Sequence, residues 1–231
     1  MSMGKSEIVR KIRNVGVIPV VRADSTEIAR RAILAILKGG IPLLEVTMTV
    51  PGAVQMIREL TREVGSEALI GAGTVLDART AQQCIEAGAQ FIVSPALDLG
   101  TISYCRERGI AIMPGALTPT EIVSAWSAGA DFVKVFPAGA LGGASYIKSL
   151  KAPLPQIEVV PTGGVSLKNA AEFIQAGAAA IGVGADLVDV NALRNGLDSE
   201  ITERARQFVG IVQEARGSKV VPVPEVVNAA R

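Results

Sequence analysis

The sequence predicts an α/β protein with a parallel sheet at its centre, and three observations support this prediction. Short apolar runs rich in β-branched residues alternate with longer segments of helical periodicity. The runs are apolar throughout, as is typical of parallel strands buried on both faces. The phrase Ala-Gly-Ala recurs where three helical segments end. With eight such runs, the pattern favours a (β/α)₈ TIM barrel over a doubly wound open sheet, which stays the structural alternative.

The elements follow in order along the chain. A leading helix is expected over residues 6–14, because this segment carries apolar residues at helical spacing before the first apolar run. The eight predicted strands cover residues 15–21, 42–48, 68–72, 91–94, 110–113, 132–136, 157–161 and 180–183. A final helix is expected over 199–215. We predict one domain over residues 1–216 and an extended or mobile tail over 217–231, which contains two prolines.

Helices between the strands are marked by their start and stop residues. Asp24 and Thr118 each open a four-residue segment that fits a capping box, and the second has proline at the first helical position. Glycines precede the following strand at five helix ends, as expected for a left-handed C-terminal residue. They are Gly39-Gly40, Gly88, Gly109, Gly129 and Gly177.

Composition narrows the possible chemistry. The chain has 23 basic and 22 acidic residues, so its charge gives no reason to expect nucleic acid or an anionic membrane as a partner. It has no histidine, which removes histidine-based nucleophile pairs and histidine-ligated metal sites. Cys84 and Cys105 lack CxxC spacing, so we expect two half-buried helix thiols. Neither a secretory signal nor a membrane-length apolar stretch is recognised, and we expect a soluble cytoplasmic protein.

Three charged residues stand inside or at the end of predicted strands: Arg22, Glu45 and Lys134. In a (β/α)₈ barrel the active site lies at the carboxyl ends of the strands. A charge in a buried strand is costly unless it is paired, so a Lys134–Glu45 ion pair is the structural explanation. The functional explanation is a lysine that forms a Schiff base, because burial favours the neutral amine that attacks a carbonyl. Glu45 is then the candidate for moving protons, since no histidine is available.

Glycine-rich turns follow the last two predicted strands, at residues 160–166 and 181–186. Turns at this place in a barrel present backbone N–H groups to phosphate. The alternative is that these glycines only make tight turns. Together, the residues predict an enzyme that acts on a phosphorylated carbonyl compound.

These motifs resemble the family of 2-keto-3-deoxy-6-phosphogluconate (KDPG) aldolases, which includes 4-hydroxy-2-oxoglutarate (KHG) aldolases. The resemblance covers residues 15–188 and rests on an ordered set of motifs. They are LEVT at 44–47, IGAGTV at 70–75, SP at 94–95, MPG at 113–115, VKVFPA at 133–138 and PTGGV at 161–165.

The resemblance implies a metal-independent class I aldolase without a cofactor, commonly a homotrimer, that cleaves KDPG into pyruvate and glyceraldehyde 3-phosphate. It also implies that Lys134 is the Schiff-base lysine and Glu45 the proton shuttle. Cleavage of KHG to pyruvate and glyoxylate is a further implied activity. The remaining implied positions are Thr74 and Pro95 in the pyruvyl pocket, Phe136 beside the lysine, and the amides of Thr162, Gly163, Gly164, Gly184 and Ala185 at the phosphate.

Two positions depart from the family pattern. Thr49 stands where many members have an arginine that meets the substrate carboxylate, and Ala185 stands where many have serine. We therefore predict that Arg22 binds the carboxylate, unless it forms a structural pair with Glu45 or Asp24. The departures leave open the choice among KDPG, its phosphogalactonate analogue and KHG.

Two further classes of protein compete with the aldolase. A phosphate-binding isomerase or epimerase barrel needs histidine and aspartate on a metal, which this chain cannot supply. A noncatalytic oligomeric scaffold has no use for charges in strand interiors.

Overall fold

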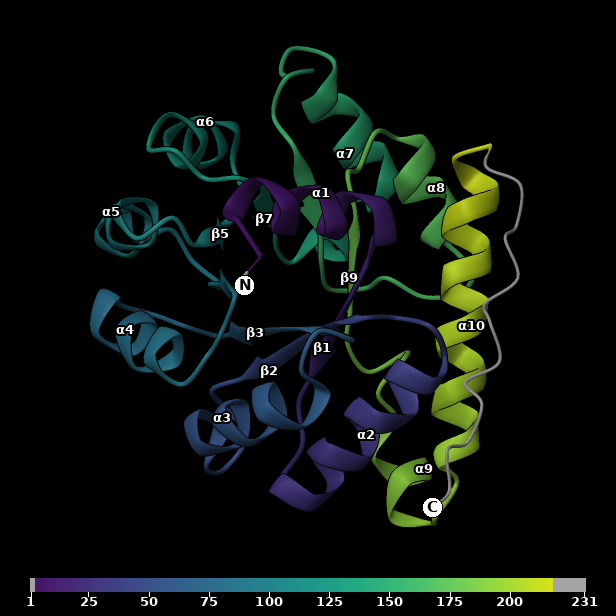
Figure 1. Ribbon diagram of the computed structural model, residues 1–231. Helices are drawn as coiled ribbons and strands as arrows, with labels where there is room; N and C mark the ends of the chain where they lie inside the picture. The colour runs from purple at the N-terminus through teal and green to yellow at the C-terminus, as the bar shows by residue number, and fades with distance from the viewer. Residues whose placement is uncertain (1–2, 218–231) are drawn as a thin grey trace.

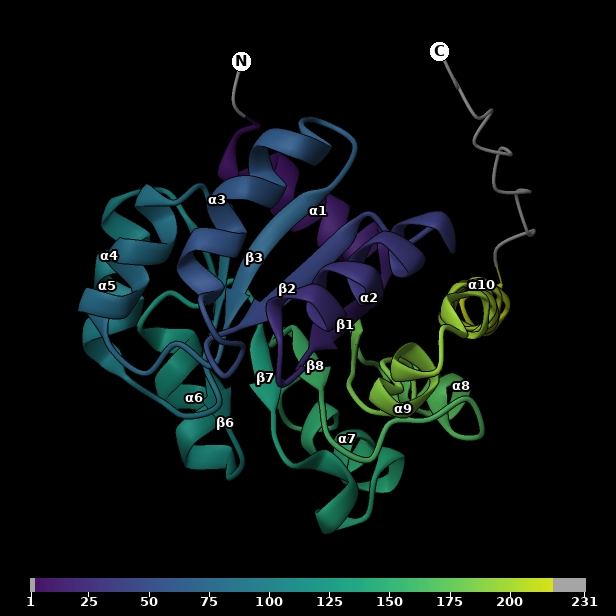
Figure 2. The ribbon, with the colours of Figure 1, turned by 90° about the horizontal axis from the view of Figure 1, so that it is seen from below.

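The computed structural model describes residues 3–217 (Figure 1). Parallel strands lie at the centre and helices surround them (Figures 1 and 2). Six strands form one curled sheet in the order β5-β4-β3-β2-β1-β9. They are β1 (Val17–Val21), β2 (Leu43–Thr47), β3 (Leu69–Gly73), β4 (Phe91–Val93), β5 (Ala111–Met113) and β9 (Ile181–Val183). This half-barrel supports the α/β prediction.

A second, three-stranded sheet has the order β6-β7-β8, formed by β6 (Gly115–Ala116), β7 (Val133–Val135) and β8 (Val159–Pro161). Only Pro114 separates β6 from β5, and a proline has no N–H to donate to a ladder. At the other side, one isolated parallel bridge joins Thr162, which follows β8, to Gly182 in β9. The two sheets are therefore neighbours on both sides.

Helices form the outer layer and follow the strands in sequence. Their bounds are α1 (Lys5–Val15), α2 (Thr26–Lys38), α3 (Ala53–Val64), α4 (Ala78–Glu86), α5 (Leu99–Glu107), α6 (Pro119–Ser127), α7 (Ala144–Lys151), α8 (Ala170–Gln175), α9 (Val190–Arg194) and α10 (Asp198–Ala215), with a 3₁₀ turn η1 (Ala138–Leu141). All eight predicted strands and both terminal helices are confirmed. Three further elements, β6, η1 and α9, were not predicted because they are too short for a periodic pattern.

The two predicted capping boxes differ in outcome. Thr118 and Glu121 form the box at α6, each side chain bonding the backbone of the other. The box predicted from Asp24 is wrong, because Ser25 is the N-cap of α2 and accepts the N–H of Ile28. Asp24 instead forms an ion pair with Arg194 of α9.

The strands are buried along their whole length, which explains their apolar sequences. Cys84 in α4 and Cys105 in α5 are fully buried, so the expectation of half-buried thiols is wrong. Burial raises the pKa of Cys84 to about 11 and that of Cys105 to about 12. In the described part of the chain, no helix combines the length and apolar character needed to cross a bilayer. The predicted tail lies outside the described residues from position 218 onward.

Candidate active site

Glu45 and Lys134 come together inside the strand layer. Glu45 is the middle residue of β2, and Lys134 is the middle residue of β7. Their side chains are 1% and 2% exposed, and both line one small cavity. The two strands belong to different sheets, so only the curl of the sheets brings them together. The rest of the cavity wall is apolar or small: Ile18, Val93, Met113, Val160, Thr162 and Gly182.

The predicted ion pair between these two groups is not formed. Within residues 3–217, no ion pair within 4.0 Å links Lys134 to Glu45. Oε1 of Glu45 is buried without any hydrogen-bond partner among these residues. Nζ of Lys134 lies 5.4 Å from the centre of the Phe136 ring, so the structure places Phe136 beside the lysine. An unpartnered buried acid is unfavourable for folding, so this arrangement points to chemistry.

Burial raises the pKa of the Glu45 carboxyl, because an apolar surrounding disfavours the carboxylate. The positive charges of Lys134 and, more weakly, Arg22 oppose this shift. The burial favours the protonated carboxyl, which can donate a proton, and the two positive charges favour the carboxylate, which can accept one.

The carboxyl of Glu45 lies against the backbone of β3 at Gly73. A Cβ atom at Gly73 would stand 2.0 Å from Oε1 of Glu45. Only glycine leaves this space, and the next residue, Thr74, has a left-handed φ of 58°. A β-branched residue rarely adopts this conformation, which marks strain at the carboxyl end of β3.

Gly73→Ala is expected to lower kcat for the aldol cleavage expected from the sequence at least about tenfold while the fold is kept. The added methyl group would displace the Glu45 carboxyl from its position near Lys134. Steady-state kinetics and circular dichroism measure both effects. Gly210→Ala in α10 is the matched control, since a Cβ there meets nothing within 4 Å. Unchanged kcat in Gly73→Ala would show that the position of the carboxyl does not limit the reaction.

A larger cavity of about 380 Å³ opens at the carboxyl ends of β1, β8 and β9. Thr162 lies in the wall of both cavities, so the two adjoin. The predicted glycine-rich turns form much of this wall, together with Phe136 and Arg22. Its full lining is Val20, Arg22, Phe136, Thr162, Gly163, Gly164, Val165, Ser166, Gly184, Ala185 and Asp186.

Four of the five predicted phosphate-binding amides are available. The N–H groups of Gly163, Gly164, Gly184 and Ala185 have no backbone acceptor among the described residues. The amide of Thr162 donates to the carbonyl of Val135 at 2.9 Å, so its predicted role at the phosphate is wrong. Its N–H is used because residue 162 still continues the ladder of β8. Gly163 and Gly164 have φ values of 84° and 80°, which explains why two glycines follow it.

Arg22 follows β1 directly and lies in the wall of the larger cavity. Neither predicted structural pair is formed, because Asp24 binds Arg194 and no ion pair within 4.0 Å joins Arg22 to Glu45. The hydroxyl of Thr49 bonds that of Thr47 at 2.7 Å, outside this cavity. Arg22 thus faces the glycine-rich turns.

Thr74 and Pro95 follow β3 and β4, but neither lines either cavity. The backbone of Pro95 instead presses against Gly115 of β6, where a Cβ would stand 2.2 Å from its carbonyl carbon. Ser166 and Asp186, the last residues of the two predicted turns, also line the larger cavity, although no role was predicted for either side chain. Asp186 accepts the N–H of Leu167 at 3.0 Å, and its position at the end of the second glycine-rich turn was the available signal.

The fold and the site define an α/β enzyme with a buried lysine and a buried acid beside a cavity lined by Arg22 and by backbone amides that have no backbone acceptor among the described residues. The chain belongs to the aldolase family described as KDPG and KHG aldolase, whose family model matches residues 8–204. It is therefore an aldolase, and its reaction class is that of a lyase. Among residues 3–217, no group of three or more cysteine, aspartate or glutamate side chains could hold a metal ion.

Named relatives cover nearly the whole chain. A 2-dehydro-3-deoxy-phosphogluconate aldolase of Treponema pallidum is 36% identical over 205 residues, which are 89% of this chain and 97% of the relative. A 2-dehydro-3-deoxy-6-phosphogalactonate aldolase of Escherichia coli is 36% identical over 200 residues, 86% of this chain and 95% of the relative. The KDPG aldolase of Legionella pneumophila, solved with pyruvate captured as a covalent carbinolamine, has a TM-score of 0.79 and 31% identity over 86% of this chain and 96% of its own.

Proposed function

We propose that the protein is a class I aldolase that cleaves KDPG into pyruvate and glyceraldehyde 3-phosphate through a Schiff base on Lys134. The observation that carries this proposal is the buried Lys134 and the unpartnered Glu45 in one cavity, next to free backbone amides. The relatives named above support the substrate class, and the carbinolamine captured in one of them supports the covalent route.

The reaction follows from these positions. The Lys134 amine attacks the C2 ketone, and Glu45 donates the proton that lets water leave the carbinolamine. Glu45 then accepts the proton of the C4 hydroxyl while the C3–C4 bond breaks. The electron pair of the C3–C4 bond moves into the iminium and gives an enamine. Glyceraldehyde 3-phosphate leaves, the enamine takes a proton at C3, and water releases pyruvate from the lysine. The imine is the electron sink, so the proposed reaction requires no metal or other cofactor.

We propose that the free amides of Gly163, Gly164, Gly184 and Ala185 bind the substrate phosphate. Thr74 and Pro95 stay proposed for the pyruvyl end. Purified protein is expected to release pyruvate from KDPG with a kcat/KM at least about tenfold above that for the unphosphorylated keto-deoxy acid. Equal values would remove the phosphate assignment, and no turnover of KDPG, its phosphogalactonate analogue or KHG would favour the noncatalytic scaffold.

Arg22→Ala and Arg22→Lys are both expected to raise KM for KDPG about tenfold or more, with kcat less affected, because a bidentate guanidinium contact is lost. The geometry favours the phosphate over the carboxylate as its partner, since Arg22 lines the wall with the glycine-rich turns. The concentration of pyruvate needed for borohydride trapping distinguishes the two, because pyruvate has the carboxylate alone. An unchanged value supports phosphate, and a raised value supports the carboxylate. An unchanged KM for KDPG in both variants would show that Arg22 does not bind the substrate.

We propose that the two sheets form one eight-stranded (β/α)₈ barrel with α1 across the amino ends of the strands. Two observations support this architecture. β5 and β6 are interrupted only by Pro114 and act as one strand position, and the Thr162–Gly182 bridge links β8 to β9. Both ends of α1 contact residues that precede strands, through Lys5–Asp131 and Arg13–Glu158.

We propose a cytoplasmic homotrimer whose ligand is a small keto-deoxy sugar acid phosphate, with no nucleic acid or membrane partner. Leu76 and Leu99 are 59% and 56% exposed and follow neighbouring strands, where a second subunit can cover them. Sedimentation is expected to give three times the chain mass at micromolar concentration. Leu76→Asp with Leu99→Asp is expected to shift the mass to that of the monomer, and a monomeric parent protein would contradict the trimer.

A further inference from the structure

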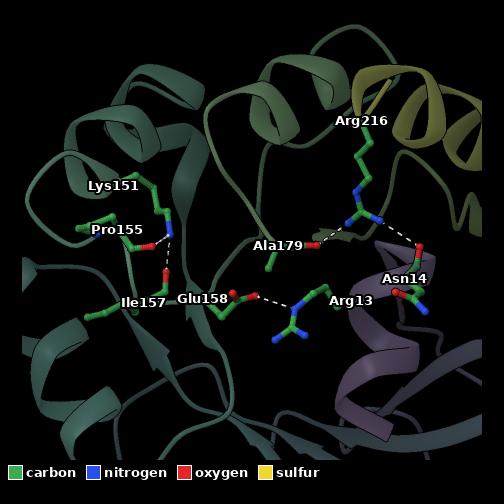
Figure 3. Close-up of polar contacts among 8 residues, drawn as sticks. All are labelled: Arg13, Asn14, Lys151, Pro155, Ile157, Glu158, Ala179 and Arg216. Carbon is green, nitrogen blue, oxygen red and sulfur yellow. Dashed lines mark hydrogen bonds and ion pairs between the residues drawn. The ribbon is translucent and has the colours of Figure 1, made fainter. Parts of the chain in front are cut away.

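We propose a second anion-binding site, for a phosphate group, at the amino ends of β8, β9 and β1. It lies at the opposite end of the strands from the candidate active site. A cavity of about 370 Å³ stands there, within the usual size range of small-molecule sites. Figure 3 shows how its polar side chains come from separate elements of the fold. Its wall includes Arg13, Asn14, Lys151, Glu158, Ala179 and Arg216.

The cavity is positively charged. Among residues 3–217, the wall contains three cations, from Arg13, Lys151 and Arg216, and one carboxylate, from Glu158. That carboxylate binds Arg13, with 3.2 Å between Oε2 and Nε. Within residues 3–217, Lys151 and Arg216 have no carboxylate within ion-pair distance. The wall therefore has an excess of two positive charges.

Backbone carbonyls fix the two unpaired cations in place (Figure 3). Lys151 donates to the carbonyls of Pro155 and Ile157 at 2.7 and 2.8 Å. Arg216 donates to the carbonyls of Asn14 and Ala179. An ammonium has three N–H donors and a guanidinium five, so each group keeps donors for a ligand. The carbonyls orient these cations without cancelling their charge.

Among residues 3–217, no carboxylate forms an ion pair with Lys151 or Arg216 to compensate their burial. Desolvation lowers the pKa of Arg216 and of Lys151, although Glu158 opposes the shift at Lys151. Gly16 makes room for this arrangement, because a Cβ there would stand 2.6 Å from Nη2 of Arg216. A bound anion would supply the missing charge.

A phosphate group fits this site better than a neutral ligand. It has two negative charges to match the excess of two positive charges, and its oxygens accept from several donors at once. The amides of Ala178 and Ala179 already donate to backbone carbonyls, so only side chains are left to bind the ligand here. This differs from the candidate active site, where free amides predominate.

The test is a calorimetric titration of the full chain with inorganic phosphate. Gly184→Asp serves as the background, because it places a carboxylate in the active-site cavity and its Cβ meets nothing within 4 Å. In that background, Asn14→Asp is expected to weaken phosphate binding at least tenfold. It adds a carboxylate to the wall. The contacts of Lys151 with Pro155 and Ile157 do not involve Asn14, and Arg216 uses only the backbone carbonyl of Asn14, so both sets of contacts are kept.

Arg62→Gln is the matched control, because it changes the net charge by the same amount on the exposed face of α3. It is expected to leave phosphate binding unchanged. Lys151→Gln and Arg216→Gln are each expected to weaken binding at least tenfold. Should either fail to fold, Asn14→Asp decides the question, and equal binding by Asn14→Asp and Arg62→Gln would overturn the proposal.

Titration with sn-glycerol 3-phosphate identifies the source of the phosphate group. Binding at least tenfold tighter than inorganic phosphate assigns the site to a phosphomonoester, and equal binding assigns it to the free ion. Either result supports the site if Asn14→Asp weakens the binding of the compound concerned. Absence of binding by either compound in the Gly184→Asp background would contradict it.

Discussion

Lys134→Ala and Lys134→Met are expected to lower aldol cleavage by at least about 10⁴-fold, the scale seen when a covalent nucleophile is removed. The methionine variant fills nearly the same volume, so it separates loss of the amine from loss of packing. Lys134 is 2% exposed among strands of both sheets, and a cavity left by alanine would destabilise the protein. Both variants are therefore measured for unfolding as well as for activity.

Intact mass after borohydride reduction with pyruvate gives the direct test of the covalent step. One pyruvate adduct is expected in the parent protein, mapping to Lys134, and none in either variant. Lys148→Ala is the control, since this lysine is exposed on α7 and lines neither cavity of the candidate site. An adduct on another lysine, or none in the parent, would end the Schiff-base assignment.

Glu45→Gln is expected to keep the fold and to lower aldol cleavage by about 10²-fold or more, as is usual for a general acid–base group. Glutamine has the same shape but cannot accept or release the proton that the carbinolamine and C4 hydroxyl exchange. The borohydride adduct with pyruvate should form more slowly in this variant yet still map to Lys134. A variant that unfolds would show instead that the carboxylate holds the fold together.

The same substitution is expected to stabilise the protein at alkaline pH. Because the pKa of Glu45 is raised on folding, the folded state holds a proton that the unfolded state has lost at intermediate pH. The free energy of unfolding of the parent therefore falls as pH rises from the ordinary glutamate pKa through the raised one. Glu45→Gln removes this loss, so its gain in Tm over the parent should be larger at pH 8 than at pH 4. Calorimetry across this range measures the difference, and a gain that shrinks with pH would contradict the raised pKa.

The sequence predicted the strands well because each is buried on both faces and reads as a continuous apolar run. It could not predict that β5 and β6, separated only by Pro114, lie in different sheets, since this depends on which ladder the missing N–H would have joined. The cap at α2 was misplaced by one residue. Ser25 and Asp24 are both good N-cap residues; in the structure Ser25 caps the helix and Asp24 pairs with the distant Arg194.

Lys134 and Glu45 could be predicted as site residues because charges are rare in buried strands. Their convergence from two sheets, and the space at Gly73 that admits the carboxyl, depend on the curl of the sheets. The amide of Thr162 was misjudged because the sequence does not show where a ladder ends. That Arg22 lines the larger cavity together with the glycine-rich turns likewise follows from tertiary structure alone.

The pairing of β1 with β9 has a consequence for synthesis of the chain. Val17 pairs with Ile181, so the first strand obtains one of its two neighbours only after more than three quarters of the chain has been made. Until then a nascent chain presents the free edge of β1, an apolar strand with unsatisfied backbone groups that can pair with another chain. Contacts of such long sequence separation also slow folding. The chain therefore depends on its last strand to protect its first, and premature termination before residue 181 leaves fragments prone to aggregate.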